Sequence, residues 1–318
     1  RQDYSYHKIW IATSYSIKEK TLWDYIGEAG GQSVLVSIPP SYPPKPVAGN
    51  LISCFITPGD DKEFTYPQEL GEEITSKFGP YIFDVEFRTD EKDKLLENIY
   101  QMTRKRFEVL NYLITTKPWD LFMFVEIGLD RVHHAFWKYM DSKHHLYTPG
   151  NPYEGVILDY YRELDSLLGE LISQVDKETV ILVVSDHGAK RMKGAFCINE
   201  WLIEEGYLVL KQRPSSPTSF DKLEVDWSKT KAWGWGGYYA RIFLNIAGRE
   251  QQGIIPPEDY EKEREILLEK LLKITGPKGE PWQTKVIKPQ EYFPELNGDY
   301  PDLMVYFDDL YWRSAGTL

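Results

Sequence analysis

The sequence predicts an α/β fold: a three-layer α/β/α sandwich in which helices cover both faces of a mostly parallel sheet. Short runs of apolar, often β-branched residues alternate along the chain with longer segments of helical periodicity. These apolar runs have no polar face, which is typical of strands buried on both sides. The chain has 318 residues, of which 42% are hydrophobic and 14% aromatic, so it can bury a substantial core.

The first part of the chain contains two expected helices and two expected strands. A helix over 21–29 ends at a pair of glycines, and the apolar run 33–38 then forms a strand that stops at a proline-rich loop. Apolar residues recur at helical spacing through 90–113, which predicts a long helix. The sequence DLFMFVE at 120–126 predicts another buried strand.

The middle of the chain continues the alternation. Residues 156–175 have the pattern of a long amphipathic helix. The five apolar residues 180–184 predict a buried strand, and a short helix at 199–205 and a strand at 207–210 follow. The polar segment 211–227 contains proline and serine, and we expect it to be a surface excursion.

The last part of the chain contains two further strands and one helix. The apolar runs 240–246 and 303–307 predict the strands. The helix at 257–272 begins with a proline, which is favoured in the first turn of a helix. The sequence has no internal repeat and no segment of low complexity, so we expect a single domain over 1–318.

Charge and cysteine content limit the possible partners. The 37 basic and 49 acidic residues give a net charge of −12, which argues against binding to a nucleic-acid backbone. A small phosphorylated substrate stays possible, because bound metal ions reverse the charge locally. We expect Cys54 and Cys197 to be reduced, buried thiols, which fits a reducing compartment, and we expect a cytoplasmic protein. No apolar run is long enough to span a membrane.

Two pairs of metal-binding residue types follow expected strands. Asp186 and His187 come directly after the run 180–184, and Asp130 follows the strand that ends near residue 126. Functional groups of open α/β sheets lie just past the carboxyl ends of strands. His134 is one helical turn beyond Asp130, so both side chains share a helix face. A carboxylate with an imidazole is a suitable half-site for Zn²⁺ or Mn²⁺.

Each pair by itself also fits a structural role. An aspartate in these positions fits a helix N-cap or a turn, and a histidine on a helix fits packing. The two pairs together favour two metal half-sites, and Gly188 allows close approach of the backbone. His133 is adjacent to His134 but points to another face of the helix, so it is the weaker candidate.

Three residues are candidates for substrate binding. Lys190 and Lys193 follow the second pair and could contact a substrate phosphate, although a solvated loop is an equal alternative. Tyr42 lies in the stiff loop PPSYPP and could line a pocket for the leaving group. A tyrosine on a surface loop is the alternative interpretation for that residue.

In these motifs the sequence resembles the alkaline phosphatase superfamily, in its type I phosphodiesterase/nucleotide pyrophosphatase branch. SDHG at 185–188 and Asp-x-x-x-His at 130–134 match the metal motifs of that superfamily, and DRVHHAFWKYMD, INEWLIEEGYL and PDLMVYF resemble archaeal and bacterial members. The resemblance extends over nearly the whole chain. It implies an alkaline-phosphatase-like domain and a hydrolase with two divalent metal ions, Zn²⁺ or Mn²⁺. Its substrate would be a small phosphorylated molecule, such as a nucleotide.

The resemblance also assigns roles to the four residues. Asp130 and His134 would bind one metal together with a more C-terminal histidine. Asp186 and His187 would bind the other together with an N-terminal aspartate and a threonine or serine nucleophile. No histidine follows His187. We therefore expect the nucleophile upstream of residue 1 and a domain that is incomplete at both termini.

The expected activity is metal-dependent hydrolysis of phosphodiester or nucleotide pyrophosphate bonds. Other activities of the superfamily are the alternatives, namely those of a phosphomonoesterase, a phosphonate hydrolase or a phosphoglycerate mutase. A noncatalytic relative that has kept the fold is a further alternative.

Overall fold

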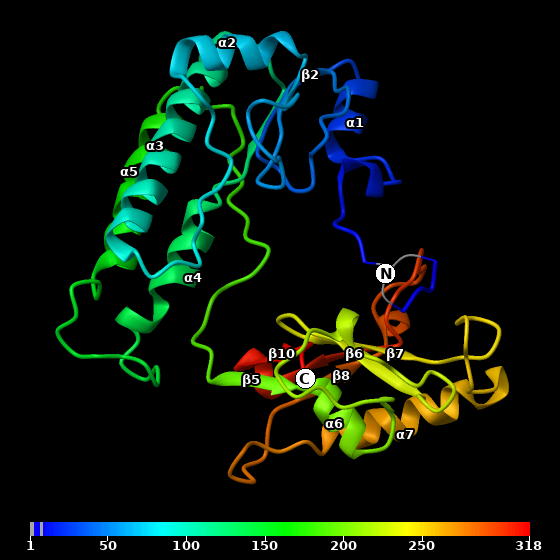
Figure 1. The fold of residues 1–318 in the computed structure, drawn as a ribbon. Helices are drawn as coiled ribbons and strands as arrows, with labels where there is room; N and C mark the ends of the chain where they lie inside the picture. The colour runs from blue at the N-terminus through cyan, green and yellow to red at the C-terminus, as the bar shows by residue number, and fades with distance from the viewer. Residues whose placement is uncertain (1–2, 7–8) are drawn as a thin grey trace. The chain divides into compact units, whose positions relative to one another are not determined.

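A computed structural model describes residues 3–6 and 9–318, which form two compact units (Figure 1). One unit is Ile11–Ala189, and the other combines Arg1–Trp10 with Lys190–Leu318. The single domain expected from the sequence stays a prediction. No helix in the described ranges is both long and apolar enough to cross a membrane.

The first unit is built on a sheet whose strand order is β3-β2-β1-β4. The strands are β1 (Ser33–Val36), β2 (Gly49–Ile52), β3 (Thr65–Tyr66) and β4 (Leu121–Phe124). The central strand β1 pairs parallel with both β2 and β4, whereas β3 is antiparallel to β2. Val36 is in register with Ile52 and with Phe124, so the carboxyl ends of the three parallel strands lie at one edge of the sheet.

Helices cover both faces of this sheet. They are α1 (Leu22–Glu28), α2 (Glu69–Phe78), α3 (Lys92–Thr116), α4 (Gly128–Met140) and α5 (Val156–Ile172). Val34 and Val36 pack into the core formed by α2 to α5, and α3, α4 and α5 lie side by side in Figure 1. Leu35 and Leu51 point to the other face, where Trp23 of α1 covers them. The predicted α/β/α layering is thus confirmed in this unit.

The segment Val180–Val184 is not a strand, and that prediction was wrong. It forms no ladder with any described strand, and the exposed fractions of its residues reach 86% at Val183. Apolar, β-branched residues of this kind favour an extended conformation. A strand also needs a hydrogen-bonding neighbour, and sequence periodicity carries no information about that neighbour.

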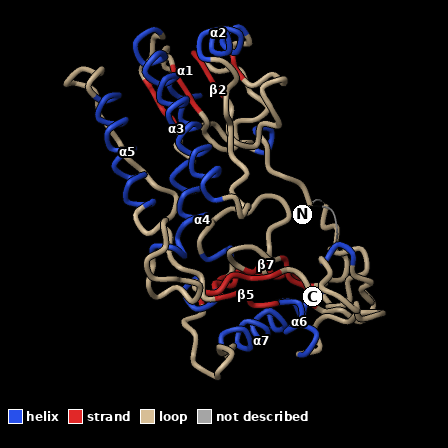
Figure 2. Tube along the Cα trace, turned by 60° about the vertical axis from the view of Figure 1, so that its left-hand side comes forward, coloured by secondary structure: helices blue, strands red, loops and turns tan. Residues whose placement is uncertain are grey.

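The second unit contains a sheet of order β6-β7-β9-β8 and a parallel pair of β5 with β10. The strands are β5 (Gly194–Cys197), β6 (Ala232–Trp235), β7 (Ala240–Leu244), β8 (Lys285–Ile287), β9 (Leu303–Tyr306) and β10 (Trp312–Ala315). Helices α6 (Ile198–Glu204) and α7 (Tyr260–Leu272) pack on the same side of the strands (Figure 2). Short 3-10 helices of this unit are Phe220–Lys222, Pro257–Asp259, Pro289–Glu291 and Phe307–Leu310, and the first unit contains one at Ser14–Ser16.

The sheet of the second unit is antiparallel, unlike the sheet of the first. A short connection joins β6 to β7, and a connection of that length forms a hairpin because a parallel crossover needs about a dozen residues. The apolar runs 240–246 and 303–307 correctly predict β7 and β9 as strands, but they carry no information about strand direction. Buried apolar strands have similar sequences in either direction when both faces are covered.

Two smaller expectations were also wrong in the second unit, those for a strand at 207–210 and for a buried Cys197. The expected strand is reduced to one bridge between Leu210 and Val225. In the segment 211–227, most side chains are exposed or half-buried, whereas some, including Phe220 and Trp227, lie in the core. Cys197 is an exposed free thiol, whereas Cys54 is free and buried as expected.

Candidate functional site

Asp130 and His134 come together at the carboxyl edge of the parallel sheet. Strand β4 ends at Phe124, and α4 begins at Gly128, so both side chains lie in the first two turns of that helix. His134 Nε2 is 3.3 Å from Asp130 Oδ1. Two donors that each bind a tetrahedral zinc ion at about 2.1 Å lie roughly 3.4 Å apart. The pair therefore has the spacing of two ligands of one metal ion.

A buried hydrogen-bond network holds the start of α4 in place. Glu126 Oε1 accepts a hydrogen bond of 2.7 Å from the Gly128 N–H. The same oxygen accepts from the hydroxyls of Thr103 and Tyr160, at 3.1 and 3.2 Å. Arg106 of α3 is fully buried and donates from Nη1 to Glu126 Oε2 at 3.1 Å. This network connects the end of β4 to α3 and α5.

Asp130 is also paired with a buried arginine. Arg131 donates from Nη1 to Asp130 Oδ2 at 2.7 Å. Burial by itself favours the protonated acid, but contact with His134 and the charge of Arg131 hold the pKa of Asp130 below its ordinary value. The Asp130 side chain is therefore an anionic carboxylate at neutral pH, as a metal ligand needs to be.

Asp186 and His187 form a separate, exposed pair in the same unit. His187 Nε2 lies 3.6 Å from Asp186 Oδ2, and the side chains are 65% and 89% exposed, respectively. The charge of His187 contributes to lowering the pKa of Asp130, so the two pairs lie within electrostatic range of each other. Within the described part of the chain, no three or more histidine, cysteine, aspartate or glutamate side chains are grouped to hold one metal.

His133 packs against aromatic rings on neighbouring turns. Its ring lies 5.5 Å from that of Trp137 and 5.8 Å from that of Tyr161 on α5. Burial lowers the pKa of His133; the charge of Asp130 opposes this shift, and His134 and His187 add to it. These contacts turn its ring toward α5.

The family model described as type I phosphodiesterase / nucleotide pyrophosphatase matches residues 1–317 of this chain. The chain belongs to this family. It is therefore a hydrolase of the phosphodiesterase/nucleotide pyrophosphatase class, and the resemblance noted in the sequence is confirmed. No curated protein and no solved structure matches it.

Members of this family generally depend on metal ions, so the candidate ligands can be compared with the needs of a metal site. The family acts on small phosphorylated molecules. In this phosphodiesterase the pair of Asp130 and His134 fits two positions of a coordination shell, since one donor is a carboxylate, the other an imidazole, and their separation is 3.3 Å. Water or substrate oxygens would complete the shell.

The three predicted substrate-binding residues belong to different units of the structure. Tyr42 is half-buried in the loop after β1, and its backbone carbonyl accepts a hydrogen bond from Ser14. Lys190 and Lys193 belong to the second unit. Lys190 pairs with Asp309 at 2.9 Å and Lys193 pairs with Asp308 at 2.8 Å. A substrate phosphate would therefore compete with a carboxylate for each ammonium group.

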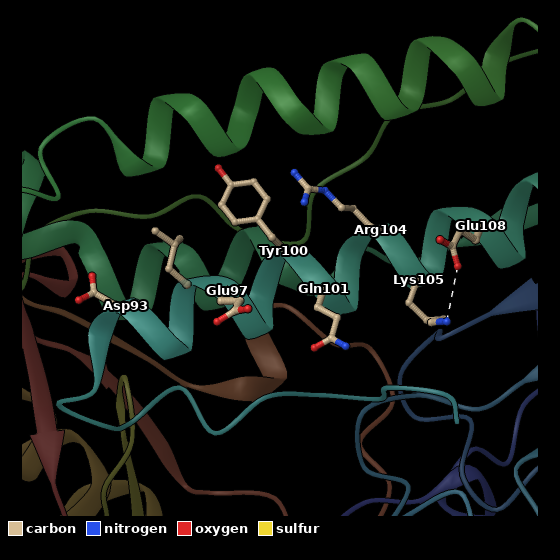
Figure 3. A pocket seen from close by; sticks show the side chains of 8 residues that line it. Asp93, Glu97, Tyr100, Gln101, Arg104, Lys105 and Glu108 are labelled. Carbon is tan, nitrogen blue, oxygen red and sulfur yellow. Dashed lines mark ion pairs between the residues drawn. The ribbon is translucent and has the colours of Figure 1, made fainter. Parts of the chain in front are cut away.

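A shallow hollow of about 730 Å³ lies along one face of α3 (Figure 3). Acidic, basic and uncharged side chains of α3 line it, and Lys105 pairs with Glu108 within it. None of the predicted site residues lines this hollow. It is therefore a solvated helix surface and not the candidate site of this phosphodiesterase.

Sequence reasoning missed Glu126, Arg131, Asp84 and Phe87, which surround the first pair. Glu126 and Arg131 lie close to Asp130 in the sequence. A polar residue at the end of a buried strand is the signal that could have identified Glu126. Asp84 and Phe87 lie in the loop between α2 and α3, far from Asp130 in sequence. Only the tertiary structure brings them to α4.

Proposed function

We propose that the protein hydrolyses phosphodiester or nucleotide pyrophosphate bonds by a metal-dependent mechanism. In this proposal Asp130 and His134 hold one metal ion, and Asp186 and His187 hold a second. The 3.3 Å approach of Asp130 Oδ1 to His134 Nε2 at the carboxyl edge of the sheet carries the proposal. Zn²⁺ or Mn²⁺ suits a set of carboxylates and imidazoles.

The residues of the chain have distinct roles in this proposal. Two divalent ions held by these residues would supply positive charge that stabilises the charge developing on the phosphoryl group. Asp130 and Asp186 provide anionic oxygens that keep the ions in the site. His134 and His187 provide neutral nitrogen donors of firm geometry. Glu126 fixes the first turn of α4 and with it the position of Asp130.

The substrate contacts are also proposals. Lys190 and Lys193 would bind phosphate oxygens after release from their carboxylate partners, and Tyr42 would pack against the leaving group. A small substrate is favoured because a net charge of −12 opposes binding of a long polyanion. A cytoplasmic location stays a prediction, supported by the two free cysteines.

The test is hydrolysis of bis-p-nitrophenyl phosphate by the full-length protein, with and without Mn²⁺. We expect turnover that EDTA abolishes. His134→Ala and Asp186→Asn should each reduce it by more than the roughly 10–100-fold that loss of an outer-shell partner costs. His145→Ala is the matched control, since His145 is exposed in a loop of the same unit.

Two results would overturn the proposal. Turnover that persists in EDTA would show that no metal is needed. Metal binding without turnover of any phosphodiester would instead identify the protein as a noncatalytic relative of the family.

A further inference from the structure

Arg131 occupies the centre of a cluster around the first candidate metal ligand pair. Its side chain is only 8% exposed, although arginine side chains are rarely buried without a partner. Its immediate charged neighbours are Asp84, from the loop between α2 and α3, and Asp130, from its own helix. We propose that the Asp84–Arg131 pair is a positioning device that fixes which oxygen of Asp130 faces the metal.

The hydrogen bonds of Arg131 give the geometry. Nε donates to Asp84 Oδ1 at 2.6 Å and Nη2 donates to Asp84 Oδ2 at 2.5 Å, which is a two-pronged contact. Such contacts fix the plane of the guanidinium group as well as its position. The remaining edge of the guanidinium, at Nη1, donates to Asp130 Oδ2 at 2.7 Å. Asp84 therefore holds Arg131, and Arg131 in turn holds one oxygen of Asp130.

Aromatic rings keep the guanidinium in place. The guanidinium carbon lies 4.4 Å from the ring centre of Phe87 and 5.4 Å from that of Phe55. Phe87 also lies 5.3 Å from the ring of His134. One phenylalanine thus contacts both the positioning arginine and the second candidate ligand, and stacking of this kind favours arginine over lysine.

The two carboxylate oxygens of Asp130 have different neighbours, and this difference affects metal binding. Oδ2 is occupied by Arg131, whereas Oδ1 faces His134 Nε2 at 3.3 Å. Asp130 would therefore bind a metal through Oδ1 alone. Asp84, Arg131 and Asp130 together keep one net negative charge, so the cluster still attracts a cation. This inference rests on the proposed function, because it assigns a task to residues around the same site.

The test measures Mn²⁺ affinity directly, from the electron paramagnetic resonance signal of free Mn²⁺, in the 318-residue chain. Asp84→Asn is nearly isosteric and weakens the hold on Arg131, and Arg131→Met removes the guanidinium. We expect each to weaken Mn²⁺ binding by about 10–100-fold, as for other outer-shell partners of metal ligands. In Arg131→Met this weakening is expected although loss of the positive charge by itself favours a cation, so it reports on positioning and not on charge. Lys117→Met is the control, since Lys117 forms a comparable 2.7 Å ion pair with Glu73 in the same unit.

A spectroscopic measurement separates positioning from a loss of structure. In Arg131→Met the Oδ2 atom of Asp130 loses its hydrogen bond and becomes available beside Oδ1, so bound Co²⁺ would gain a ligand atom and its visible absorption would weaken. Arg131→Lys keeps the positive charge but lacks the planar guanidinium that makes two hydrogen bonds to Asp84. Its affinity for Mn²⁺ should therefore stay below that of the wild type. A variant with unchanged melting temperature, weakened Mn²⁺ binding and a weakened Co²⁺ spectrum supports the positioning role.

The failure of this inference is distinct from failure of the proposed function. If His134→Ala abolishes Mn²⁺ binding while Asp84→Asn and Arg131→Met stay within twofold of the wild type, the positioning role is refuted and the metal site stands. If His134→Ala binds Mn²⁺ as well as the wild type, the proposed metal site is refuted, and the positioning role with it.

Discussion

Gly128, the first residue of α4, has no room for a side chain. A Cβ atom there would lie 2.1 Å from the hydroxyl oxygen of Tyr160 and 2.5 Å from Glu126 Oε1. It would also lie 2.6 Å from the hydroxyl oxygen of Thr103. The helix that carries Asp130 can therefore start this close to the buried network only because residue 128 is glycine.

Replacing Gly128 by alanine should destabilise the protein. We expect a loss of about 1–3 kcal/mol in the free energy of unfolding, because the extra carbon forces apart buried groups. Gly169→Ala in the exposed face of α5 is the matched control, since a Cβ there meets nothing within 4 Å. That change should stabilise by about 0.5–1 kcal/mol. Urea denaturation of both variants measures the difference, and equal effects would contradict this account of Gly128.

His133 should make the stability of the protein depend on pH. Burial lowers its pKa below the ordinary value of 6.5, so the unfolded chain takes up a proton at a higher pH than the folded chain. The stabilisation from neutral His133 is present above about pH 6.5 and is lost as the pH falls through the folded pKa. Urea midpoints at pH 8 and pH 5.5 measure this loss.

His133→Phe should reduce that dependence. Phenylalanine keeps an aromatic ring against Trp137 and Tyr161 but carries no titrating group. The difference between the two urea midpoints should therefore be smaller in the variant than in the wild type. An unchanged difference would show that other groups cause it.

At the scale of secondary-structure elements, the pair of Arg106 and Glu126 joins α3 to the end of β4. Both side chains are buried, at 1% and 8% exposure. Glu126 also binds Tyr160 of α5 and the N–H of Gly128 in α4. One buried carboxylate thus connects three helices to one strand. Replacing Glu126 should therefore destabilise the protein by more than the loss of one hydrogen bond.

Replacing only Arg106 should lower the free energy of unfolding more than replacing both members of this pair. Arg106→Met leaves Glu126 as a buried charge without its partner, and we expect a loss of about 3–5 kcal/mol. Arg106→Met combined with Glu126→Gln leaves no buried charge and keeps an acceptor for the Gly128 N–H. The double variant should therefore be more stable than Arg106→Met alone, as measured by urea denaturation. A double variant whose loss equals the sum of the single losses would contradict the coupling.

Local elements were predictable where the signal is contained in neighbouring residues. The helix expected at 90–113 is Lys92–Thr116, and the strand expected at 120–126 is Leu121–Phe124. The approach of Asp130 to His134 follows from their spacing on one helix. Val180–Val184 shows the limit, since its composition is that of a strand but its pairing depends on a partner elsewhere.

At the scale of the whole molecule, the sequence predicted the family and the α/β class but not the strand directions in the second unit. The mostly parallel sheet describes the unit Ile11–Ala189, whereas the main sheet of the other unit is antiparallel. The contacts of Asp84 and Phe87 with Arg131 and His134 depend on how a long loop folds back onto α4. Periodicity and spacing describe single elements, so they do not contain such contacts.

The central claim is that Asp130 and His134 are ligands of one metal ion. Anomalous X-ray diffraction from crystals soaked in Zn²⁺, recorded on both sides of the zinc absorption edge, tests it most directly. We predict an anomalous peak within about 2.0–2.2 Å of both Asp130 Oδ1 and His134 Nε2. A zinc ion bound elsewhere in the protein, with none between these two atoms, would contradict the account.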